Sequence, residues 1–241
     1  MADDSAVSRS ESESSPQRVE RRGVFGRIVR SLLHSREASI LIAGILLVVY
    51  FQTTAPAFLS QGNIANLAEY AATTAIIAAG EVMVLICSEV DLSVGQVYAL
   101  APFVMYYANA AGVPYLVSIL LGLLVGALVG FINGVVTVVL GIPSFITTLG
   151  TLFIINGLTL TISGGFPVAP KVEPIISTLF GGNAISQILW AICITLVFQF
   201  ILVKTRWGLH TIATGGNLIG AAEVGIKINR IKIGNFMMCS V

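Results

Sequence analysis

The stretch Glu89-Val90-Asp91-Leu92-Ser93-Val94-Gly95 interrupts an apolar part of the chain, between the runs Ile76–Cys87 and Val97–Met105. It places two carboxylates between two apolar segments, and a carboxylate without a partner is costly in hydrocarbon. The glycine, with Asp and Ser just before it, suits a turn or a broken helix whose freed backbone groups need polar partners. The pattern therefore predicts a multi-span membrane protein with a polar seam.

The composition agrees with a membrane protein. Of the 241 residues, 56% are hydrophobic and 10% are charged, whereas about a quarter of an average soluble domain is charged. The net charge of +1 hides a segregation, because Lys171 is the only basic residue between Arg36 and Lys204. Once the two terminal basic clusters are assigned to a membrane face, no basic surface is left for nucleic acid.

Cysteines and histidines are too few and too scattered for a catalytic or metal site. Cys87, Cys193 and Cys239 lie in apolar sequence without metal-ligand spacing and predict neither a disulfide framework nor a metal centre. His34 and His210 fall outside the predicted spans, so a nucleophile–base pair within the membrane is not favoured. We predict no catalytic residue and no metal ligand.

The first 37 residues divide into two segments. Residues 1–17 are rich in Ser, Glu and Asp, and we expect them to be disordered. Residues 18–37 carry six arginines with apolar residues between them, a spacing that suits an amphipathic helix on the cytoplasmic, anionic membrane surface. A plain basic cluster that fixes the topology explains the same residues equally well.

Six apolar segments are long enough, or nearly so, to cross a bilayer. An even number of crossings puts both basic clusters on one side, which the positive-inside rule makes cytoplasmic. We therefore predict a multi-pass protein of the cell membrane with a cytoplasmic N-terminus. The predicted spans are Ala38–Phe58, Ile64–Cys87, Val94–Ala110, Tyr115–Leu140, Ser144–Ile162 and Ile185–Val203.

Residues 231–241 resemble the first half of a seventh span. Half a span does not complete a crossing, so we expect the sequence to be truncated at its C-terminus. The predicted fold is therefore all-α, a polytopic transmembrane helix bundle of six spans plus the start of a seventh. It occupies residues 38–241.

Polar residues in and between the spans are the candidates for a translocation path. Glu81 lies deep in an apolar span. For Glu89 and Asp91, a water-facing helix end and a place in the translocation path explain the sequence about equally well. The hydroxyl-rich run 144–151 follows a Gly-x-Pro break, where helix ends offer free backbone donors to a polar solute. Hydroxyls and amides also bond within and between helices, which is the structural alternative. The path candidates are Glu81, Glu89, Asp91, Ser93, Asn133, Thr147, Thr148 and Asn156.

Glycine recurs every four residues in the fourth predicted span, at Gly122, Gly126, Gly130 and Gly134. On a helix these positions form a flat stripe on which another helix packs at short range. We expect a helix-packing role here rather than a contact with solute.

Residues 205–230 form a polar stretch punctuated by glycine, with a short helical segment expected at Ala221-Ala222-Glu223. Their chemistry alone favours a plain connecting loop over a docking segment for a soluble partner.

Several motifs then occur in a fixed order. Asp91-Leu92-Ser93-Val94-Gly95 is followed by Asn133-Gly134, by Ser144-Phe145-Ile146-Thr147-Thr148-Leu149-Gly150-Thr151, by Ser163-Gly164-Gly165 and by Gly215-Gly216-Asn217. From Ala38 onwards the chain resembles the permease subunits of ATP-binding-cassette importers for simple sugars, the ribose/xylose/galactoside permease family. The Asp-Leu-Ser-Val-Gly motif is the sharpest part of this resemblance.

The resemblance implies a permease without catalysis or cofactor of its own. It implies cytoplasmic ATPase subunits that use ATP, an extracytoplasmic solute-binding protein and a second permease subunit, in a homodimer or heterodimer. Residues 205–230 would then be the loop that couples the permease to the ATPase. The coupling candidates are Gly215, Gly216, Asn217, Ala221, Ala222, Glu223 and Gly225.

The chain departs from the family pattern in two places. Leu218-Ile219-Gly220-Ala221-Ala222 stands where the family often has Pro-Glu-Ala-Ala-Arg, so Glu223 is displaced from the usual acid. Ser88-Glu89 stands where Gly-Gly is more usual, and the added carboxylate is a candidate for altering substrate choice. Two alternatives stay open: a permease for another polar solute, such as a branched-chain amino acid or a nucleoside, and an ion-coupled secondary transporter.

Overall fold

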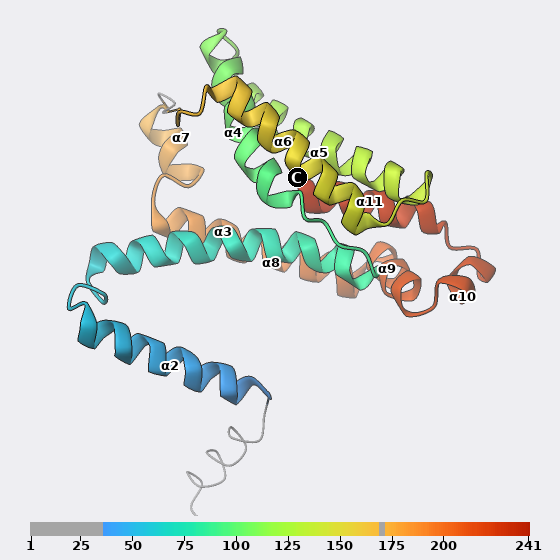
Figure 1. The fold of residues 1–241 in the computed structure, drawn as a ribbon, viewed down its shortest axis with the longest axis horizontal. Coiled ribbons are helices and arrows are strands. Elements are labelled where there is room, and N and C mark those ends of the chain that lie inside the picture. Colours follow the sequence, from blue (N-terminus) through green and yellow to red (C-terminus); the bar gives the residue numbers. More distant parts are fainter. Residues whose placement is uncertain (1–35, 169–171) are drawn as a thin grey trace, which may run out of the picture. The chain divides into compact units, whose positions relative to one another are not determined.

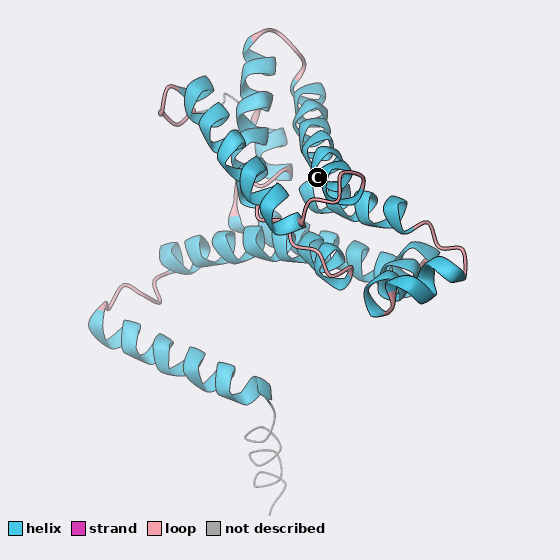
Figure 2. Cartoon of the chain, turned by 45° about the vertical axis from the view of Figure 1, so that its right-hand side comes forward, coloured by secondary structure: helices cyan, strands magenta, loops and turns pink. Residues whose placement is uncertain are grey.

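The computed structural model describes residues 36–168 and 172–241. The predicted disordered tail, 1–17, and nearly all of the predicted basic segment, 18–37, lie outside the described residues. Within the described residues all regular secondary structure is helical (Figure 2), which confirms the all-α prediction.

The long helices follow the predicted apolar segments (Figure 1). Residues 205–230, predicted as a loop, contain two short helices. The helices are α2 (Arg36–Thr54), α3 (Gln61–Ile86), α4 (Val94–Ala110), α5 (Tyr115–Val138), α6 (Ser144–Ser163), α7 (Pro174–Leu179), α8 (Ala184–Lys204), α9 (Arg206–Gly216), α10 (Leu218–Glu223) and α11 (Ile228–Ser240).

The chain forms two compact units, which divide between Ser60 and Gln61. In the first unit, α2 ends in a turn where the rings of Phe51 and Phe58 stack with centroids 5.4 Å apart. The Gln52 side chain accepts a hydrogen bond from Leu59 N at 3.0 Å and closes this turn. The second unit contains α3 to α11 and all the candidate site residues.

Four helices, α3, α5, α6 and α8, are long and apolar enough to cross a membrane. Among the other described helices, α4 has 17 residues, α11 has 13, and the apolar part of α2, Ile40–Thr54, is also short. The predicted count of six spans and the start of a seventh is therefore not confirmed.

The second unit is built around α5 and α11, which make its most extensive contact. Three glycines of α5 face the backbone of α11: a Cβ atom built on Gly126 or Gly130 would overlap a carbonyl oxygen of α11, and one on Gly134 would lie 2.8 Å from Ile233 Cα. Gly122 instead faces α4, where an added Cβ would lie 2.8 Å from the Met105 side chain. Only the absence of a side chain allows these helices to approach so closely.

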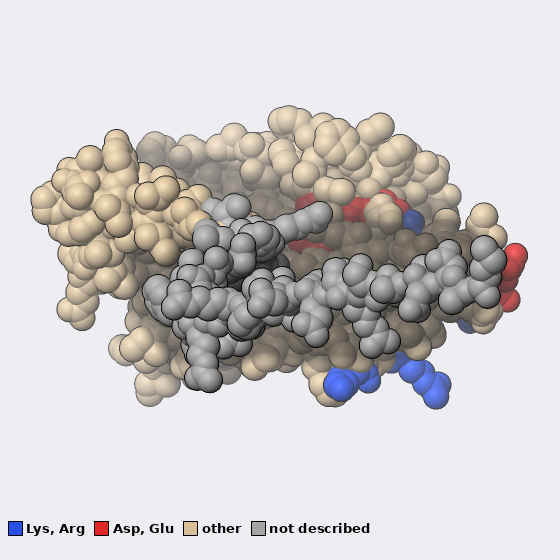
Figure 3. Space-filling model, turned by 90° about the horizontal axis from the view of Figure 1, so that it is seen from below, with Lys and Arg blue, Asp and Glu red and all other residues tan. Residues whose placement is uncertain are grey.

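Large apolar side chains cover the outside of the second unit. Leu120 and Leu124 on α5 are 63% and 62% exposed. The face drawn in Figure 3 carries few charged side chains among the described residues. Exposed apolar surface of this extent is unusual for a water-soluble monomer and is what lipid-facing helices present.

Candidate functional site

The chain reverses between α3 and α4, in a segment that we call the break, residues 87–93. Ser88 has a φ of 60°, a left-handed conformation that glycine adopts more readily. The chain then runs back along α3, since Asp91 N lies 3.1 Å from Glu81 Oε1. Glu81 is five residues before the end of α3, or about 8 Å along a helix. The first turn of α4 therefore lies inside the bundle rather than at the end of α3.

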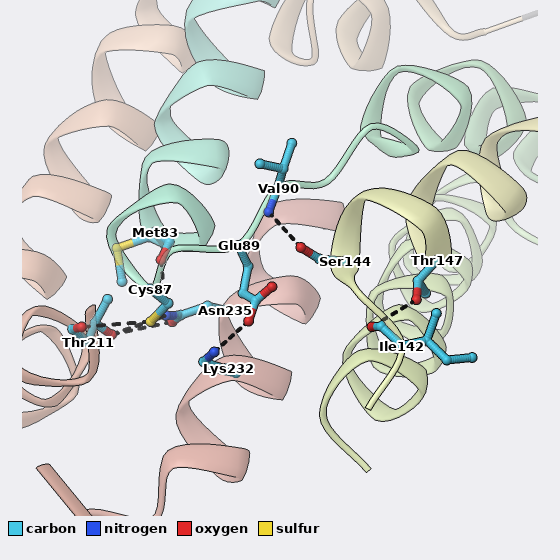
Figure 4. Close-up of polar contacts among 10 residues, drawn as sticks. All are labelled: Met83, Cys87, Glu89, Val90, Ile142, Ser144, Thr147, Thr211, Lys232 and Asn235. Carbon is cyan, nitrogen blue, oxygen red and sulfur yellow. Dashed lines mark hydrogen bonds and ion pairs between the residues drawn. The ribbon is translucent and has the colours of Figure 1, made fainter. Parts of the chain in front are cut away.

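Three consecutive backbone N–H groups of the break donate to side chains of other elements. Val90 N donates to Ser144 Oγ at 3.2 Å (Figure 4), and Leu92 N to Thr148 Oγ1 at 3.1 Å. Asp91 N donates to Glu81, as above. Extended backbone inside a membrane protein lacks both water and helix partners, so these side chains supply the acceptors that it needs. Glu81 and Thr148 thus hold the backbone of the break.

The Asp91 carboxylate begins a buried polar chain that runs from the break into α5 and α6. Asp91 is 2% exposed, and its Oδ1 accepts from Ser93 N at 2.9 Å and from Ser93 Oγ at 2.6 Å. Asn133 Nδ2 donates to Ser93 Oγ at 2.8 Å, and Thr151 Oγ1 donates to Asn133 Oδ1 at 2.6 Å. In the described part of the chain no cation pairs with Asp91, so neutral donors alone stabilise this carboxylate.

Each of the three candidate acids also contacts α11. Lys232 forms an ion pair with Glu89, and the two side chains are 13% and 15% exposed (Figure 4). Cys239 Sγ donates to Glu81 Oε2 at 3.2 Å, and Ser240 Oγ donates to Asp91 Oδ2 at 3.5 Å. The sequence contains no local signal for this role of α11, because Lys232 lies in the C-terminal basic stretch that the positive-inside rule assigns to the cytoplasmic side.

Asn235 is a second site residue that the sequence pattern does not predict. It is 1% exposed, and its Nδ2 donates to Met83 O at 3.1 Å and to Thr211 Oγ1 at 3.2 Å. Trp207 Nε1 donates to Asn235 Oδ1 at 2.8 Å. Cys87 completes the cluster, with Sγ 3.1 Å from Asn235 Nδ2 (Figure 4). One amide therefore joins α3, α9 and α11, and its signal in the sequence is an asparagine beside the apolar run 236–239.

Two path candidates lie apart from this network. Thr147 is 8% exposed and donates to Ile142 O, just before the start of α6, at 3.5 Å (Figure 4). Asn156 is half-buried on α6. The structure thus brings Glu81, Asp91, Ser93, Asn133 and Thr148 together and places Glu89 beside them. A role of these residues in a path stays a prediction.

The coupling candidates lie on α9, α10 and the turn that follows. Gly215 packs on the end of α3, where an added Cβ would overlap Ile86 O, whereas Gly216 faces open space. Asn217 caps α10 through Oδ1, which accepts from Gly220 N at 2.9 Å. The remaining candidates divide into buried Ala221, exposed Ala222 and Glu223, and Gly225 with a φ of 84°.

Within residues 36–168 and 172–241 no group of three His, Cys, Asp or Glu side chains is placed to hold a metal ion.

The apolar helices and the buried polar break define a multi-pass membrane protein. The chain belongs to the family described as the branched-chain amino acid transport system / permease component, whose model matches residues 63–241. This membership and the curated relatives together confirm the resemblance to importer permeases.

Three relatives are similar over most of the chain. The xylose/arabinose import permease protein XylH of Sulfolobus acidocaldarius is 34% identical over 211 residues, which cover 84% of this chain and 58% of the relative. The probable ABC transporter permease protein YphD of Escherichia coli is 36% identical over 203 residues, 83% of this chain and 61% of the relative. The ribose import permease protein RbsC of Bacillus subtilis is 35% identical over 192 residues, which cover 78% of this chain and 60% of the relative.

The chain thus spans about three fifths of the length of these curated relatives. No solved structure matches the chain.

Proposed function

We propose that this chain forms the membrane-spanning core of a permease subunit that imports a simple sugar. The sugar is delivered by an extracytoplasmic binding protein, and ATP is hydrolysed by a separate cytoplasmic subunit. The observation that carries this proposal is the similarity, over 84% and 78% of the chain, to proteins named as xylose/arabinose and ribose import permeases.

The chemistry of the break is compatible with a neutral, hydroxyl-rich solute. Its buried donors and acceptors are hydroxyls, amides and carboxylates, and the one cation close to it, among the described residues, is neutralised by Glu89. A sugar exchanges hydrogen bonds with such groups without a net charge to compensate. In this proposal the path runs along the break and opens alternately to the two sides of the membrane.

We propose a topology of six spans and the start of a seventh, with a cytoplasmic N-terminus and a cytoplasmic α9–α10 segment. Apolar side chains of that segment are exposed, with Ile219 at 72% and Val224 at 77%. They offer a contact surface to the ATPase. A second permease subunit, identical or related, completes the assembly.

The test is purification of the full-length protein with a candidate ATPase, followed by reconstitution in liposomes. We expect ATP hydrolysis and uptake of labelled xylose or ribose to rise when the sugar-loaded binding protein is added. An empty binding protein is the matched control. Uptake that continues without ATP and collapses with the ion gradient would instead establish a secondary transporter.

A second candidate solute is a branched-chain amino acid, favoured by the description of the matching family. The same liposomes distinguish the two, with leucine and its binding protein in place of the sugar pair. Stimulation by the leucine pair alone would replace the sugar in this proposal.

A further inference from the structure

One face of α11 contacts both the break and the α9 helix. Lys232, Asn235 and Cys239 are spaced by three and four residues, so they lie on the same side of the helix. Lys232 binds Glu89 of the break, Asn235 binds Trp207 and Thr211 of α9, and Cys239 binds Glu81.

The contact between α9 and α11 is short and directional. An added Cβ on Gly234 would overlap the ring of Trp207, so the indole lies directly against the α11 backbone. The indole N–H donates to the side-chain oxygen Oδ1 of Asn235 at 2.8 Å. The side-chain nitrogen Nδ2 of Asn235 donates to Thr211 of α9 and to Met83 of α3. A buried amide with this many partners has few alternative positions, because each lost hydrogen bond leaves a buried polar group unpaired.

We propose that Lys232 and Asn235 are positioning residues that connect α9 to the break. Asn235 fixes α11 to α9, and Lys232 fixes the break to α11. Displacement of α9 by the ATPase therefore moves the break, and with it Asp91 and the start of α4. This inference rests on the proposed function.

Lys232 and Asn235 each have a control of the same residue type outside residues 205–230. Lys204 lies at the end of α8 and Asn66 lies on α3, and both are exposed. Lys204→Gln and Asn66→Ala thus repeat the chemistry of Lys232→Gln and Asn235→Ala at exposed positions outside the coupling segment.

The experiment measures solute imported per ATP hydrolysed by the full-length transporter with its ATPase and binding protein in liposomes. Lys232→Gln and Asn235→Ala are expected to lower this ratio about fivefold or more while ATP hydrolysis persists. The two controls are expected to keep the wild-type ratio. Exchange of the charges in Glu89→Lys/Lys232→Glu is expected to restore part of the ratio lost in Lys232→Gln.

Alkylation of Cys87 supplies a measurement that needs no destabilising variant. Its sulfur lies 3.1 Å from Asn235 Nδ2 and 3.7 Å from Thr211 O, at the junction of the three helices. In a Cys193→Ser background, the rate of Cys87 modification by N-ethylmaleimide, read by mass spectrometry, is expected to change when the ATPase is trapped with ADP and vanadate.

The outcomes separate this inference from the proposed function. ATP-driven uptake by the wild type, with an unchanged ratio in both variants, would overturn the positioning role alone. An active transporter in which the rate of Cys87 modification stays the same when the ATPase is trapped would also overturn the positioning role alone. Uptake by the wild type without any need for ATP would overturn both proposals.

Discussion

Lys232 of α11 and Glu89 of the break form an ion pair, although 143 positions of the sequence separate them. Both side chains are mostly buried, at 13% and 15% exposure. Glu89 is thus a mostly buried, paired carboxylate and not one at a water-facing helix end, and its place in a translocation path stays a prediction. A partly buried pair is costly to break from one side only, because the remaining charge loses its partner.

Glu89→Gln and Lys232→Gln are each expected to lower the free energy of unfolding by about 1–3 kcal/mol, because each leaves one buried charged group unpaired. The double variant is expected to lose less than the sum of the two. Thermal unfolding in detergent of the two single variants and the double variant measures this coupling. Additive losses would mean that the pair contributes nothing of its own.

The sequence predicted the helices better than their contacts. Apolar runs and glycine–proline breaks are local signals, so Val94–Ala110 was predicted with the bounds that α4 has. The partners of the break are not local: Glu89 meets a residue of α11, and Asn235 meets Met83 across 152 positions. Such contacts depend on how helices pack in space, which the spacing along one chain does not encode.

Thr148→Val is expected to destabilise the second unit by about 1–3 kcal/mol. The hydroxyl accepts from Leu92 N at 3.1 Å and donates to Ser144 O at 2.8 Å, and valine leaves the Leu92 N–H without an acceptor. Thr161→Val is the matched control, since Thr161 is exposed and its hydroxyl donates to Gly157 O of its own helix at 2.8 Å. Equal thermal stability of the two variants would show that the break does not depend on this acceptor.

Gly130→Ala is expected to cost about 1–3 kcal/mol through overpacking. The added methyl group overlaps Phe236 O and lies 2.7 Å from Met237 Cα. On α6, a Cβ added at Gly157 would contact no other part of the protein within 4 Å. Gly157→Ala is therefore expected to leave the free energy of unfolding unchanged or to raise it by up to about 1 kcal/mol through helix propensity. Thermal unfolding and size-exclusion profiles in detergent compare them. Similar profiles for both would mean that α5 and α11 do not pack at this distance.

Asp91→Asn is expected to reduce solute uptake about tenfold or more while the protein still inserts in the membrane. Asparagine keeps one acceptor for Ser93, whose N–H and hydroxyl lie 2.9 Å and 2.6 Å from Asp91 Oδ1, but it removes the charge. Uptake normalised to the amount of protein in the membrane measures this effect. Exposed Glu173 provides the control variant, Glu173→Gln. Wild-type uptake by Asp91→Asn would restrict Asp91 to a structural role.

Gly215 and Gly216 are neighbours on α9 with opposite surroundings. A Cβ added on Gly215 would overlap Ile86 O and lie 2.7 Å from Ile86 C. A Cβ added on Gly216 would face open space, with no contact within 4 Å. Gly215→Ala is therefore expected to push α9 away from the end of α3. Gly216→Ala is expected to leave α9 where it is.

The separation of α9 from α3 has a functional readout if α9 transmits the movement of the ATPase. Gly215→Ala is expected to lower solute uptake per ATP hydrolysed about fivefold or more, and Gly216→Ala to leave it unchanged. Both variants are measured in the same liposomes at equal protein content. A lower ratio in both would point to a general effect of side chains in this segment. An unchanged ratio in both would return residues 205–230 to a plain connection between α8 and α11.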